Sequence, residues 1–463
     1  ASIGVHTAMQ ASTPMLLFIG QVGLEHQGRE AFQELDYRQV FGPIAKYVTE
    51  ITDVSRTPEI VRRAWSLAIS GRPGPVVIAL PEDVLTQSAQ MQIPDVPILP
   101  PKSAAVGEDL ELLAVKLQSA QRPVILAGGG RWEVQDRNAL QACARKLNIP
   151  VLTAFRYHDL FDNTDPLFVG EAGVGMTANT KRLLTEADVV LAVNLRFGEM
   201  TTNAFTLFGA DRGAQWIAQS HRSGDEFHKY VAPNLSMISD PAPLLDGLRT
   251  RLEGQSMGQN PAWATSARAG FSAAQTAKPQ PSPVDMGVVT STLQAVLPPD
   301  AIVTNGAGNF AIWPNKFMQF SKHQRLLAPQ SGAMGYGLPA AIAAKVAYPE
   351  RCVVCFAGDG DFQMNGQELG AALQAGARPI VLIVNNGSYG TIRMHQERQY
   401  PRRVSGTDMI NPDFAALARA YGFHGERIER TEDFADAFSR ALASPNGAVL
   451  DLNVASEAIT PGM

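Results

Sequence analysis

The sequence predicts an α/β protein made of three doubly wound parallel-sheet domains. Apolar strand-like runs alternate with amphipathic helical runs in three successive blocks, and two segments without such periodicity separate the blocks. Alternation of this kind is typical of parallel sheets that carry helices on their faces. The length of 463 residues suits about three domains. We expect domains at 1–88, 109–253 and 284–463, joined by linkers at 89–108 and 254–283.

The composition excludes several classes of protein. The formal net charge is −5, so nothing in the charge balance favours nucleic acid or an anionic membrane as a partner. No apolar run approaches the ~18 residues of a transmembrane helix. Charged residues make up 18% of the chain, which is low for a soluble protein and favours surface buried between subunits. Three cysteines are too few for a disulfide framework, so we expect a cytoplasmic protein.

The first block is predicted to contain strands at 15–19 and 75–80, with an amphipathic helix at 58–70 between them. The proline-rich stretch 93–101 has no helical period and is typical of an extended linker. The chain starts at Ala1 in a segment without the features of a signal peptide, and its apolar residues read as the middle of a domain. We therefore expect the natural N-terminus to lie further upstream.

The two later blocks repeat the alternation. In the second block we expect helices at 110–120 and 137–147, and strands at 123–127, 150–153 and 188–193. The third block has the clearest pattern. Its predicted strands are 301–304, 352–356, 380–384 and 448–454, and its predicted helices are 337–347, 367–375, 414–421 and 434–442.

The strongest functional signal follows two neighbouring strands of the third block. Gly358-Asp-Gly-Asp-Phe362 ends one strand, and Asn385-Asn386 ends the next, 27 residues after Asp359. Both loops then lie at the carboxyl edge of a parallel sheet, where ligands bind. The glycines let backbone N–H groups approach an anion, and the helix predicted after Phe362 points its positive end there.

These residues suit a magnesium site. The carboxylate of Asp359, the amide oxygen of Asn386 and the backbone carbonyl of Ser388, with two phosphate oxygens and a water, would complete six-coordinate Mg²⁺. Each motif alone is an ordinary turn, but the pair at this spacing resembles the metal–diphosphate motif of thiamine diphosphate (ThDP) enzymes. The resemblance implies that eight residues here contact the cofactor: Gly358, Asp359, Gly360, Asp361, Asn386, Ser388, Tyr389 and Gly390.

Two further segments of the third block share this resemblance. The segment from Gln330 to Ala340 looks like the part of acetolactate synthases that holds the aminopyrimidine ring. The resemblance implies that the Gly332 carbonyl accepts from the 4′-amino group and that Met334 bends the cofactor, although a core-filling role would also suit this methionine. Asn305-Gly-Ala-Gly-Asn309 resembles the other diphosphate loop, with Gly308 and Asn309 as contacts.

The first block resembles the C-terminal part of the family's pyrimidine-binding domain. Gly20-Gln-Val22, Ala31-Phe-Gln-Glu34 and Gly71-Arg-Pro-Gly-Pro75 carry the similarity. In acetolactate synthases the residues that match Phe32, Gln33 and Lys46 reach an active site shared with a second subunit. A solvated surface position is the alternative for Lys46.

The resemblance therefore covers essentially the whole chain, as pyrimidine-binding, central and diphosphate-binding domains, and is closest to acetolactate synthase. Three features depart from that pattern. The family's essential glutamate would lie upstream of Ala1, so this chain alone is expected to be inactive. Met200 stands where an arginine binds the acceptor's carboxylate, and His395 stands where a tryptophan selects the acceptor.

Two other motifs have competing interpretations. Gly128-Gly-Gly-Arg131 follows a strand and suits either an FAD-binding loop or a plain strand-to-helix turn, because it lacks a full G-x-G-x-x-G. Cys352 and Cys355 resemble a metal or redox pair. Residues three apart on a strand point to opposite faces, so we expect both in the core.

Together these features predict a ThDP- and Mg²⁺-dependent enzyme that decarboxylates a 2-oxo acid and joins the product to a second carbonyl compound. The resemblance implies the reaction of two pyruvates to acetolactate and CO₂, in a homodimer or homotetramer. Two alternatives remain. One is another ThDP lyase or decarboxylase, of the aldehyde lyase or acyl-CoA decarboxylase type. The other is a non-catalytic cofactor-binding protein, if the chain is naturally this short.

Overall fold

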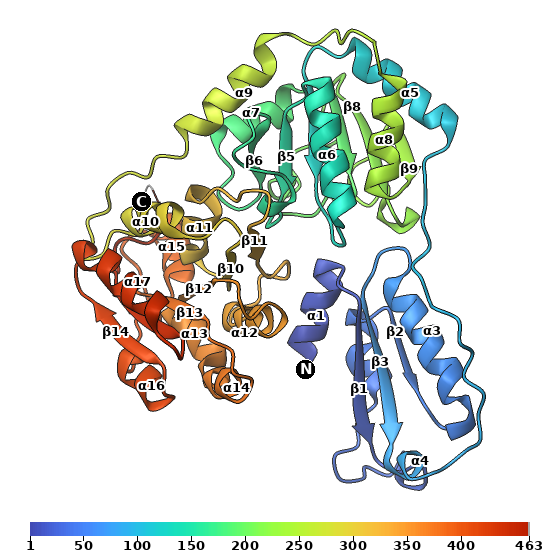
Figure 1. Ribbon diagram of the computed structural model, residues 1–463, viewed down its shortest axis with the longest axis vertical. Helices are drawn as coiled ribbons and strands as arrows, with labels where there is room; N and C mark the ends of the chain where they lie inside the picture. Colours follow the sequence, from blue (N-terminus) through green and yellow to red (C-terminus); the bar gives the residue numbers. More distant parts are fainter. Residues whose placement is uncertain (462–463) are drawn as a thin grey trace.

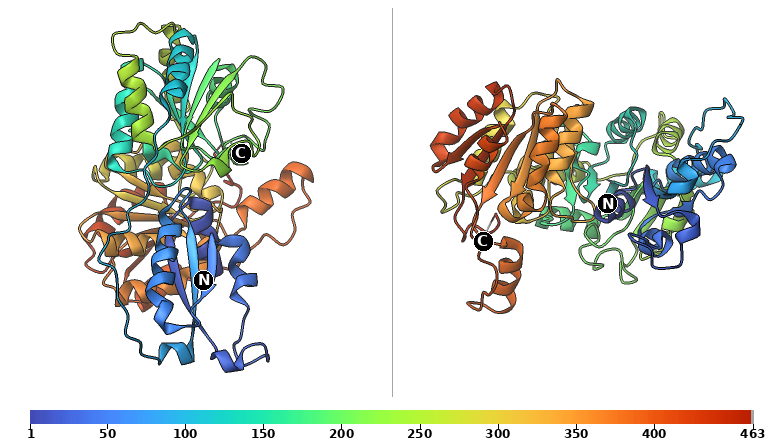
Figure 2. Two further views of the ribbon diagram at one scale, coloured as in Figure 1. Left: turned by 90° about the vertical axis from the view of Figure 1, so that its right-hand side faces the viewer. Right: turned by 90° about the horizontal axis from the view of Figure 1, so that it is seen from below.

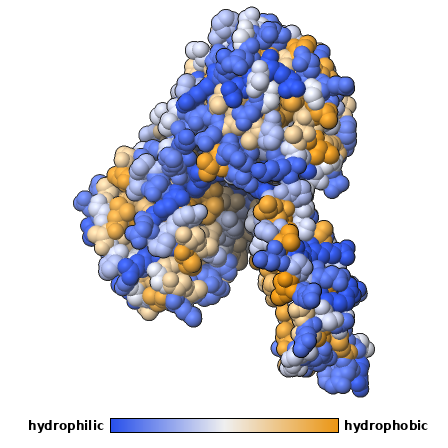
Figure 3. Space-filling view, turned by 45° about the vertical axis from the view of Figure 1, so that its right-hand side comes forward, coloured by the Kyte–Doolittle hydropathy of each residue, from blue (hydrophilic) through white to orange (hydrophobic). Residues whose placement is uncertain are grey.

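The computed structural model describes residues 1–461, and within that range every strand belongs to one of three parallel sheets (Figure 1). This arrangement confirms the predicted fold class. The described residues contain no helix that is both long and apolar enough to cross a membrane. The N-terminal domain projects as an arm beside the C-terminal domain (Figure 3). A groove of about 850 Å³ lies between their facing helices.

The N-terminal domain is built on a three-stranded sheet. Its elements are α1 (Ser2–Ala11), β1 (Met15–Gln21), α2 (Tyr37–Phe41), β2 (Tyr47–Glu50), α3 (Thr57–Ile69), β3 (Pro75–Pro81) and α4 (Glu82–Leu85). The strand order β1-β3-β2 puts the buried strand β3 in the middle. Alternate side chains of β3 serve two cores, because Val77 packs with Val5 of α1 while Val76 packs with Ala64 of α3 on the other face.

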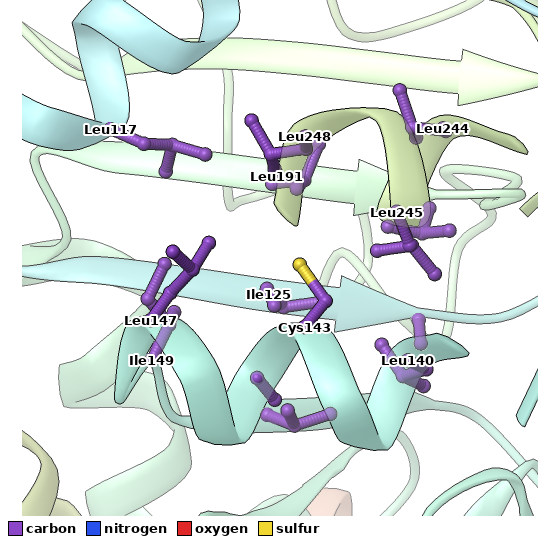
Figure 4. Packing of buried hydrophobic residues seen from close by; sticks show 14 of the residues in the cluster. Leu117, Ile125, Leu140, Cys143, Leu147, Ile149, Leu191, Leu244, Leu245 and Leu248 are labelled. Atoms are coloured by element: carbon purple, nitrogen blue, oxygen red, sulfur yellow. The ribbon is translucent and has the colours of Figure 1, made fainter. Parts of the chain in front are cut away.

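The central domain contains a six-stranded sheet covered by helices on both faces. Its elements are α5 (Gly107–Ser119), β4 (Pro123–Ala127), α6 (Val134–Leu147), β5 (Val151–Ala154), β6 (Phe168–Ala172), α7 (Ala178–Glu186), β7 (Val189–Val193), β8 (Trp216–His221), β9 (Leu235–Ile238), α8 (Pro241–Arg251) and α9 (Ala262–Ala273). The strand order is β6-β5-β4-β7-β8-β9. Figure 4 shows Cys143 of α6 and Leu248 of α8 packed over Ile125 of β4.

Helix α9 corrects the prediction of a continuous linker at 254–283. Trp263, Ala267 and Phe271 recur at a spacing of four residues, and all three are buried against the central domain. The indole N–H of Trp263 donates to the carbonyl of Pro123 at 2.9 Å. The small and polar residues around this stripe gave the segment a linker-like composition, although one face of it is a core face.

The C-terminal domain has a second six-stranded parallel sheet. Its strands are β10 (Ile302–Asn305), β11 (Arg325–Leu327), β12 (Val353–Gly358), β13 (Ile380–Asn385), β14 (His424–Ile428) and β15 (Ala448–Asn453), in the order β11-β10-β12-β13-β15-β14. Its helices are α10 (Met286–Val296), α11 (Ile312–Phe317), α12 (Gly337–Ala347), α13 (Asp359–Asn365), α14 (Leu369–Gln374), α15 (Gly390–Gln399), α16 (Phe414–Ala420) and α17 (Phe434–Ala443). The neighbouring strands β10, β12 and β13 bring three loops to one edge.

Two local details of this domain bear on the predictions. Helix α13 begins at Asp359, so Asp359 and Asp361 lie in its first turn. The sequence analysis places both residues in a loop, with the helix starting after Phe362. Acidic residues suit the first turn of a helix, where backbone N–H groups are free to donate. Cys355 packs in the core on one face of the sheet and Cys352 lies against the core on the other, so the expected division of this pair is confirmed.

Candidate active site

A cavity of about 440 Å³ lies between the carboxyl edge of the C-terminal sheet and the loops after β5 and β6 of the central domain. All twelve residues that the sequence resemblance assigns to cofactor contact line this cavity. They are Gly308, Asn309, Gly332, Met334, Gly358, Asp359, Gly360, Asp361, Asn386, Ser388, Tyr389 and Gly390. They come from segments up to 82 residues apart in sequence, so it is the fold that assembles them.

Asp359 joins the two predicted metal loops. Its Oδ2 accepts from the backbone N–H of Gly387 at 2.8 Å and from the side-chain amide of Asn411 at 2.7 Å. Its Oδ1 accepts from the backbone N–H of Gly360 at 2.9 Å. Burial raises the pKa of this carboxyl, against the lowering effect of those hydrogen bonds. A cation beside Asp359 would favour the ionised form.

The two adjacent asparagines have different surroundings. The amide of Asn385 donates to Asp451 Oδ1 at 2.9 Å, and its oxygen accepts from Asn411 at 2.8 Å. Asn385 is therefore anchored to β15. Asn386 lines the cavity, and its oxygen accepts from the N–H of Ser388 at 3.1 Å, which leaves this oxygen capacity for a ligand.

Asp361 connects two other loops of the edge. Its Oδ1 accepts from the N–H of Ala307 at 3.0 Å and from the N–H of Gly335 at 2.9 Å. Burial raises the pKa of this carboxyl to about 6. A side chain at Gly306 would collide with the same carboxylate, so this position requires glycine. Asp361 thus holds the loop after β10 against the loop before α12.

Close packing against Phe310 explains two of the glycines in the cavity lining. A Cβ at Gly308 would lie 2.8 Å from the ring of Phe310, and one at Gly358 would lie 2.7 Å from it. Asn309 is held by Thr391, whose hydroxyl accepts from the Asn309 N–H at 3.1 Å and donates to Asn309 Oδ1 at 3.0 Å. The Ser388 hydroxyl is buried without a hydrogen-bond partner.

These features fit a diphosphate with a divalent cation. Glycine backbone and a helix start suit phosphate oxygens, and carboxylate and amide oxygens suit Mg²⁺. Within residues 1–461 no group of three His, Cys, Asp or Glu side chains is placed to hold a metal. A cation at Asp359 would therefore need neutral oxygens as further ligands, such as the Asn386 amide, water or a bound ligand.

Comparison with known proteins identifies two of the three domains. Residues 306–452 match the model of the thiamine pyrophosphate enzyme C-terminal, TPP-binding domain, and residues 110–248 match the model of the central domain of the same enzymes. The acetolactate synthase large subunit of Parasynechococcus marenigrum is 33% identical over 97% of this chain and 74% of the relative. The chain belongs to the thiamine pyrophosphate enzyme family.

Other relatives give the same result. Acetolactate synthase isozyme 3 large subunit of Escherichia coli is 29% identical over 96% of this chain and 79% of the relative. A probable acetolactate synthase large subunit of Methanocaldococcus jannaschii is 30% identical over 97% and 78%, respectively. The TPP-binding domain of this family thus contains the three loops that meet at the cavity.

The central-domain wall of the cavity was missed by the sequence analysis. It contains Arg156, His158 and Glu171, which follow or end strands β5 and β6. The backbone N–H of Arg156 donates to Glu171 Oε1 at 2.5 Å. Arg156 has a φ of +62°, a left-handed conformation that is rare outside glycine. Charged residues directly after apolar strands are the signal that could have found this wall.

The same wall holds the loop that carries Gly332 and Met334. The guanidinium of Arg156 donates to the carbonyl of Pro329, and the amide of Gln330 donates to the carbonyl of Phe155 at 3.0 Å. From the N-terminal domain, the Thr7 hydroxyl pairs with the Ser331 hydroxyl at 2.9 Å. Loop 329–336 is therefore in contact with all three domains.

Three predicted residues of the N-terminal domain lie away from the cavity within one chain. Phe32 and Gln33 follow β1, whose carboxyl end points away from the other two sheets (Figure 1), and the Phe32 side chain is 88% exposed. The Lys46 ammonium donates to the carbonyls of Leu67 at 2.6 Å and Ser70 at 2.8 Å. Burial, followed by nearby Arg72, lowers the pKa of Lys46.

The two predicted substrate residues also lie outside the cavity lining. Met200 follows β7 in the central domain, and His395 is an exposed residue of α15. The arginines nearest to them in sequence are engaged elsewhere. Arg196 donates to the carbonyl of Gln10 at 2.7 Å, and Arg393 donates to the carbonyl of Ser456 at 3.3 Å.

The Gly128–Arg131 turn is packed closely against other parts of the chain. It lies at the carboxyl end of β4, beside β7, where the strand order reverses and a dinucleotide would bind. The chain itself covers this turn: a side chain at Gly129 would collide with the Asn194 carbonyl, and one at Gly130 with the Ala11 carbonyl. The amide of Asn194 also donates to the carbonyl of Gly130 at 2.9 Å. This close packing explains the glycines, as expected for a plain strand-to-helix turn.

Proposed function

We propose that this protein is a ThDP- and Mg²⁺-dependent enzyme that decarboxylates a 2-oxo acid and joins the product to a second carbonyl compound, as acetolactate synthase does with two pyruvates. The observation that carries the proposal is the convergence of twelve resemblance-assigned residues on one cavity. The names of the relatives, all acetolactate synthase large subunits among those described above, support the reaction class.

Each part of the cofactor would have its own residues. Gly308, Asn309 and the backbone of Gly358–Gly360 would hold the diphosphate, while Asp359, Asn386 and the Ser388 carbonyl would hold Mg²⁺. The Gly332 carbonyl and the Met334 side chain would hold the pyrimidine ring. When bound, ThDP supplies the electron sink that decarboxylation requires.

The residues of this chain would provide position and environment. Asp359 adds negative charge beside that of the diphosphate, and a bound cation would offset both, so metal binding and diphosphate binding would be coupled. Apolar side chains form part of the cavity lining, and an apolar surrounding favours a step that loses charge. They include Phe155, Met334, Trp313 and Ile459. At the far wall, Arg156 places a cation near the loop that carries Gly332.

The proposed function includes assembly into a homodimer or homotetramer. Phe32, Gln33 and Lys46 lie away from the cavity of their own chain, so a shared site would take them from a second subunit. Several apolar side chains are exposed on the N-terminal domain, as expected for an interface. They include Ile3, Phe18, Phe32 and Leu35. We expect light scattering at micromolar concentration with cofactor to show dimers or tetramers, and a monomer alone would contradict this.

A second candidate function is ligation to a neutral aldehyde. The resemblance assigns the acceptor position to Met200, which lies outside the cavity of its own chain and has no donor for a carboxylate, and Arg196 and Arg393 are engaged with backbone carbonyls. A lost charge-assisted hydrogen bond of ~1.5–3 kcal/mol corresponds to roughly 10- to 150-fold in selectivity. We expect a competition assay between acceptors, with pyruvate as donor, to show no strong preference for a 2-oxo acid over a neutral aldehyde. The same assay should show no preference for 2-ketobutyrate over pyruvate as acceptor. A hundredfold preference for 2-oxo acids would favour ordinary acetolactate synthase.

Cofactor binding tests the proposal without requiring turnover. We expect calorimetry to show ThDP binding that depends on Mg²⁺, and Asp359→Ala to abolish it because the anionic metal ligand is lost. Asn386→Ala should weaken binding by less, since an amide oxygen is a neutral ligand. Asp408→Ala is the matched control, because it removes an exposed carboxylate near the site without removing a ligand. Unchanged ThDP affinity in Asp359→Ala would contradict the metal assignment.

A further inference from the structure

Residues 407–411 form a strap along the loop 386–389, which contains the predicted metal ligands Asn386 and Ser388. The N–H of Tyr389 donates to the Thr407 carbonyl and the N–H of Met409 donates to the Gly387 carbonyl, both at 2.8 Å. Ser388 and Asp408 form an isolated antiparallel bridge between these hydrogen bonds. Helix α15, which stands out from the body of the domain in Figure 2, separates the two segments in sequence. The strap therefore fixes the loop that contains Asn386 and Ser388.

Asn411, at the end of this strap, uses both ends of its amide. Its Nδ2 donates to Asp359 Oδ2 at 2.7 Å and to Asn385 Oδ1 at 2.8 Å. Its Oδ1 accepts from the amide of Gln363 at 3.0 Å. An amide nitrogen has two hydrogens, so both are used. The orientation of the Asn411 amide is thus set, because its nitrogen must face the two acceptor oxygens, Asp359 Oδ2 and Asn385 Oδ1.

This contact limits how Asp359 can bind a metal. The Oδ2 atom accepts two hydrogen bonds, from Gly387 and Asn411, which occupy both of its lone-pair positions. The Oδ1 atom accepts one, from Gly360. The free lone pair of this carboxylate is therefore on Oδ1.

We propose that Asn411 is a positioning residue that presents Asp359 to the metal through one oxygen, Oδ1. The inference rests on the proposed Mg²⁺ site. Magnesium requires near-ideal octahedral geometry and short bonds, whereas calcium accepts carboxylates through one or both oxygens at variable distances. By keeping Oδ2 occupied, Asn411 favours a Mg²⁺-like geometry and disfavours two-oxygen binding of a larger ion.

The surroundings of Asn411 separate this role from a packing role. The residue is half-buried and lies between the exposed residues Ile410 and Pro412. Its hydrogen bonds go to three polar side chains, and Asn411→Ala removes no core side chain. We therefore expect the variant to fold, with a melting temperature in the absence of metal close to that of the unaltered protein.

The test titrates metal into protein that contains excess ThDP, measured by calorimetry. We expect Asn411→Ala to weaken Mg²⁺ binding by roughly 10- to 100-fold, the usual effect of losing a partner of a metal ligand. Ca²⁺ binding should fall much less, so the preference for Mg²⁺ over Ca²⁺ narrows. Asn411→Leu, which keeps the side-chain size without any donor, should behave as Asn411→Ala does. The control is Ile410→Ala, which alters an exposed neighbour on the same strap and should change neither affinity.

Each other outcome has a definite meaning. Unchanged Mg²⁺ affinity in Asn411→Ala, or equal losses for Mg²⁺ and Ca²⁺, would overturn the positioning role. A loss of equal size in Ile410→Ala would do the same, because it would show that the strap acts only as a scaffold. If the unaltered protein shows no metal-dependent ThDP binding, the proposed function fails first, and the inference fails with it.

Discussion

Glu171 and His158 face each other in the central-domain wall of the cavity, with Oε2 and Nε2 3.4 Å apart. Burial raises the pKa of Glu171 to about 8 and lowers the pKa of His158 to about 4. Both side chains are therefore uncharged at pH 7, and the contact is not a salt bridge under those conditions. At the scale of the residue, burial outweighs the attraction that two opposite charges would have here.

The protonated state of Glu171 predicts a pH-dependent stability. Above the ordinary pKa of 4.5, the unfolded chain ionises this carboxyl while the folded chain keeps it protonated. The free energy of unfolding should therefore fall as the pH rises from about 4.5 to about 8, by at most ~1.4 kcal/mol per pH unit. Glu171→Gln should remove this loss, as measured by denaturant unfolding at pH 5, 7 and 9. The exposed control Glu59→Gln should retain it, and parallel curves for Glu171→Gln and the unaltered protein would contradict the prediction.

The twelve residues predicted to contact the cofactor, all of which line the cavity, could be singled out from sequence because each lies in a short recognisable motif. Their supporting residues could not be found in that way. Asn411 lies 52 residues from Asp359, and Thr391 lies 82 residues from Asn309. Such pairs meet only through the fold, and a single Asn or Thr carries no local signal of its partner.

Helix α9 shows, at the scale of the element, how composition can conceal a core face. Phe271 packs edge-on against Phe168 of β6, with ring centroids 5.2 Å apart. The guanidinium of Arg268 lies over the Phe271 ring. The guanidinium of Arg268 also donates to the carbonyls of Asn163 and Phe168. The helix is therefore part of the central domain rather than a tether to the next one.

Truncating the α9 core face should destabilise the central domain. We expect Phe271→Ala to cost about 3–5 kcal/mol, because it removes a buried aromatic side chain and leaves a cavity. A lower melting temperature in a calorimetric scan would show this loss. Ser272→Ala is the control on the same helix, since Ser272 is exposed and its loss should have little effect. Equal melting temperatures for both variants would show that α9 contributes little to the domain.

The elements differ in how well the sequence predicts them. Buried central strands such as β4, β7, β12 and β13 are continuous apolar runs, and their positions agree with the predictions to within two residues. Strand β14 at a sheet edge reads His-Gly-Glu-Arg-Ile, and β11 has three residues, so neither shows a strand pattern. An edge strand has one paired neighbour and partial solvent contact, which relaxes its need for apolar residues.

Glu226 joins two domains at the scale of the whole molecule. Its carboxylate contacts Arg72 of the N-terminal domain at 3.1 Å, and Arg196 and Lys229 of the central domain at 3.4 and 2.8 Å. Burial acts to raise the pKa of Glu226, but these three cations together lower it to about 2. Arg72 also donates to the carbonyl of Met9 at 2.5 Å, so the contact extends to the end of α1.

Neutralising Glu226 should loosen the N-terminal domain. Glu226→Gln leaves three cations without their carboxylate, and because these cations are partly exposed the cost should be smaller than for a fully buried ion pair. We expect faster cleavage within residues 86–106 by a broad-specificity protease at pH 7. In the unaltered protein the stabilisation by this contact should be complete above pH 4.5 and should be lost as the pH falls from about 4.5 toward 2. The reason is that the pKa of Glu226 is lower in the folded chain than in the unfolded chain. Identical cleavage rates for Glu226→Gln and Glu59→Gln would contradict the role of this contact.

Loop 329–336 is held by the central domain through Arg156 and Gln330 and by the N-terminal domain through Thr7. A ligand that changed the conformation of this loop would therefore act on contacts with both other domains. Such coupling is reciprocal. If a ligand stabilises one arrangement of the domains, that arrangement binds the ligand more tightly by the same free energy. Variants at the domain contacts and variants in the cavity would then shift one shared equilibrium, although they lie in different domains.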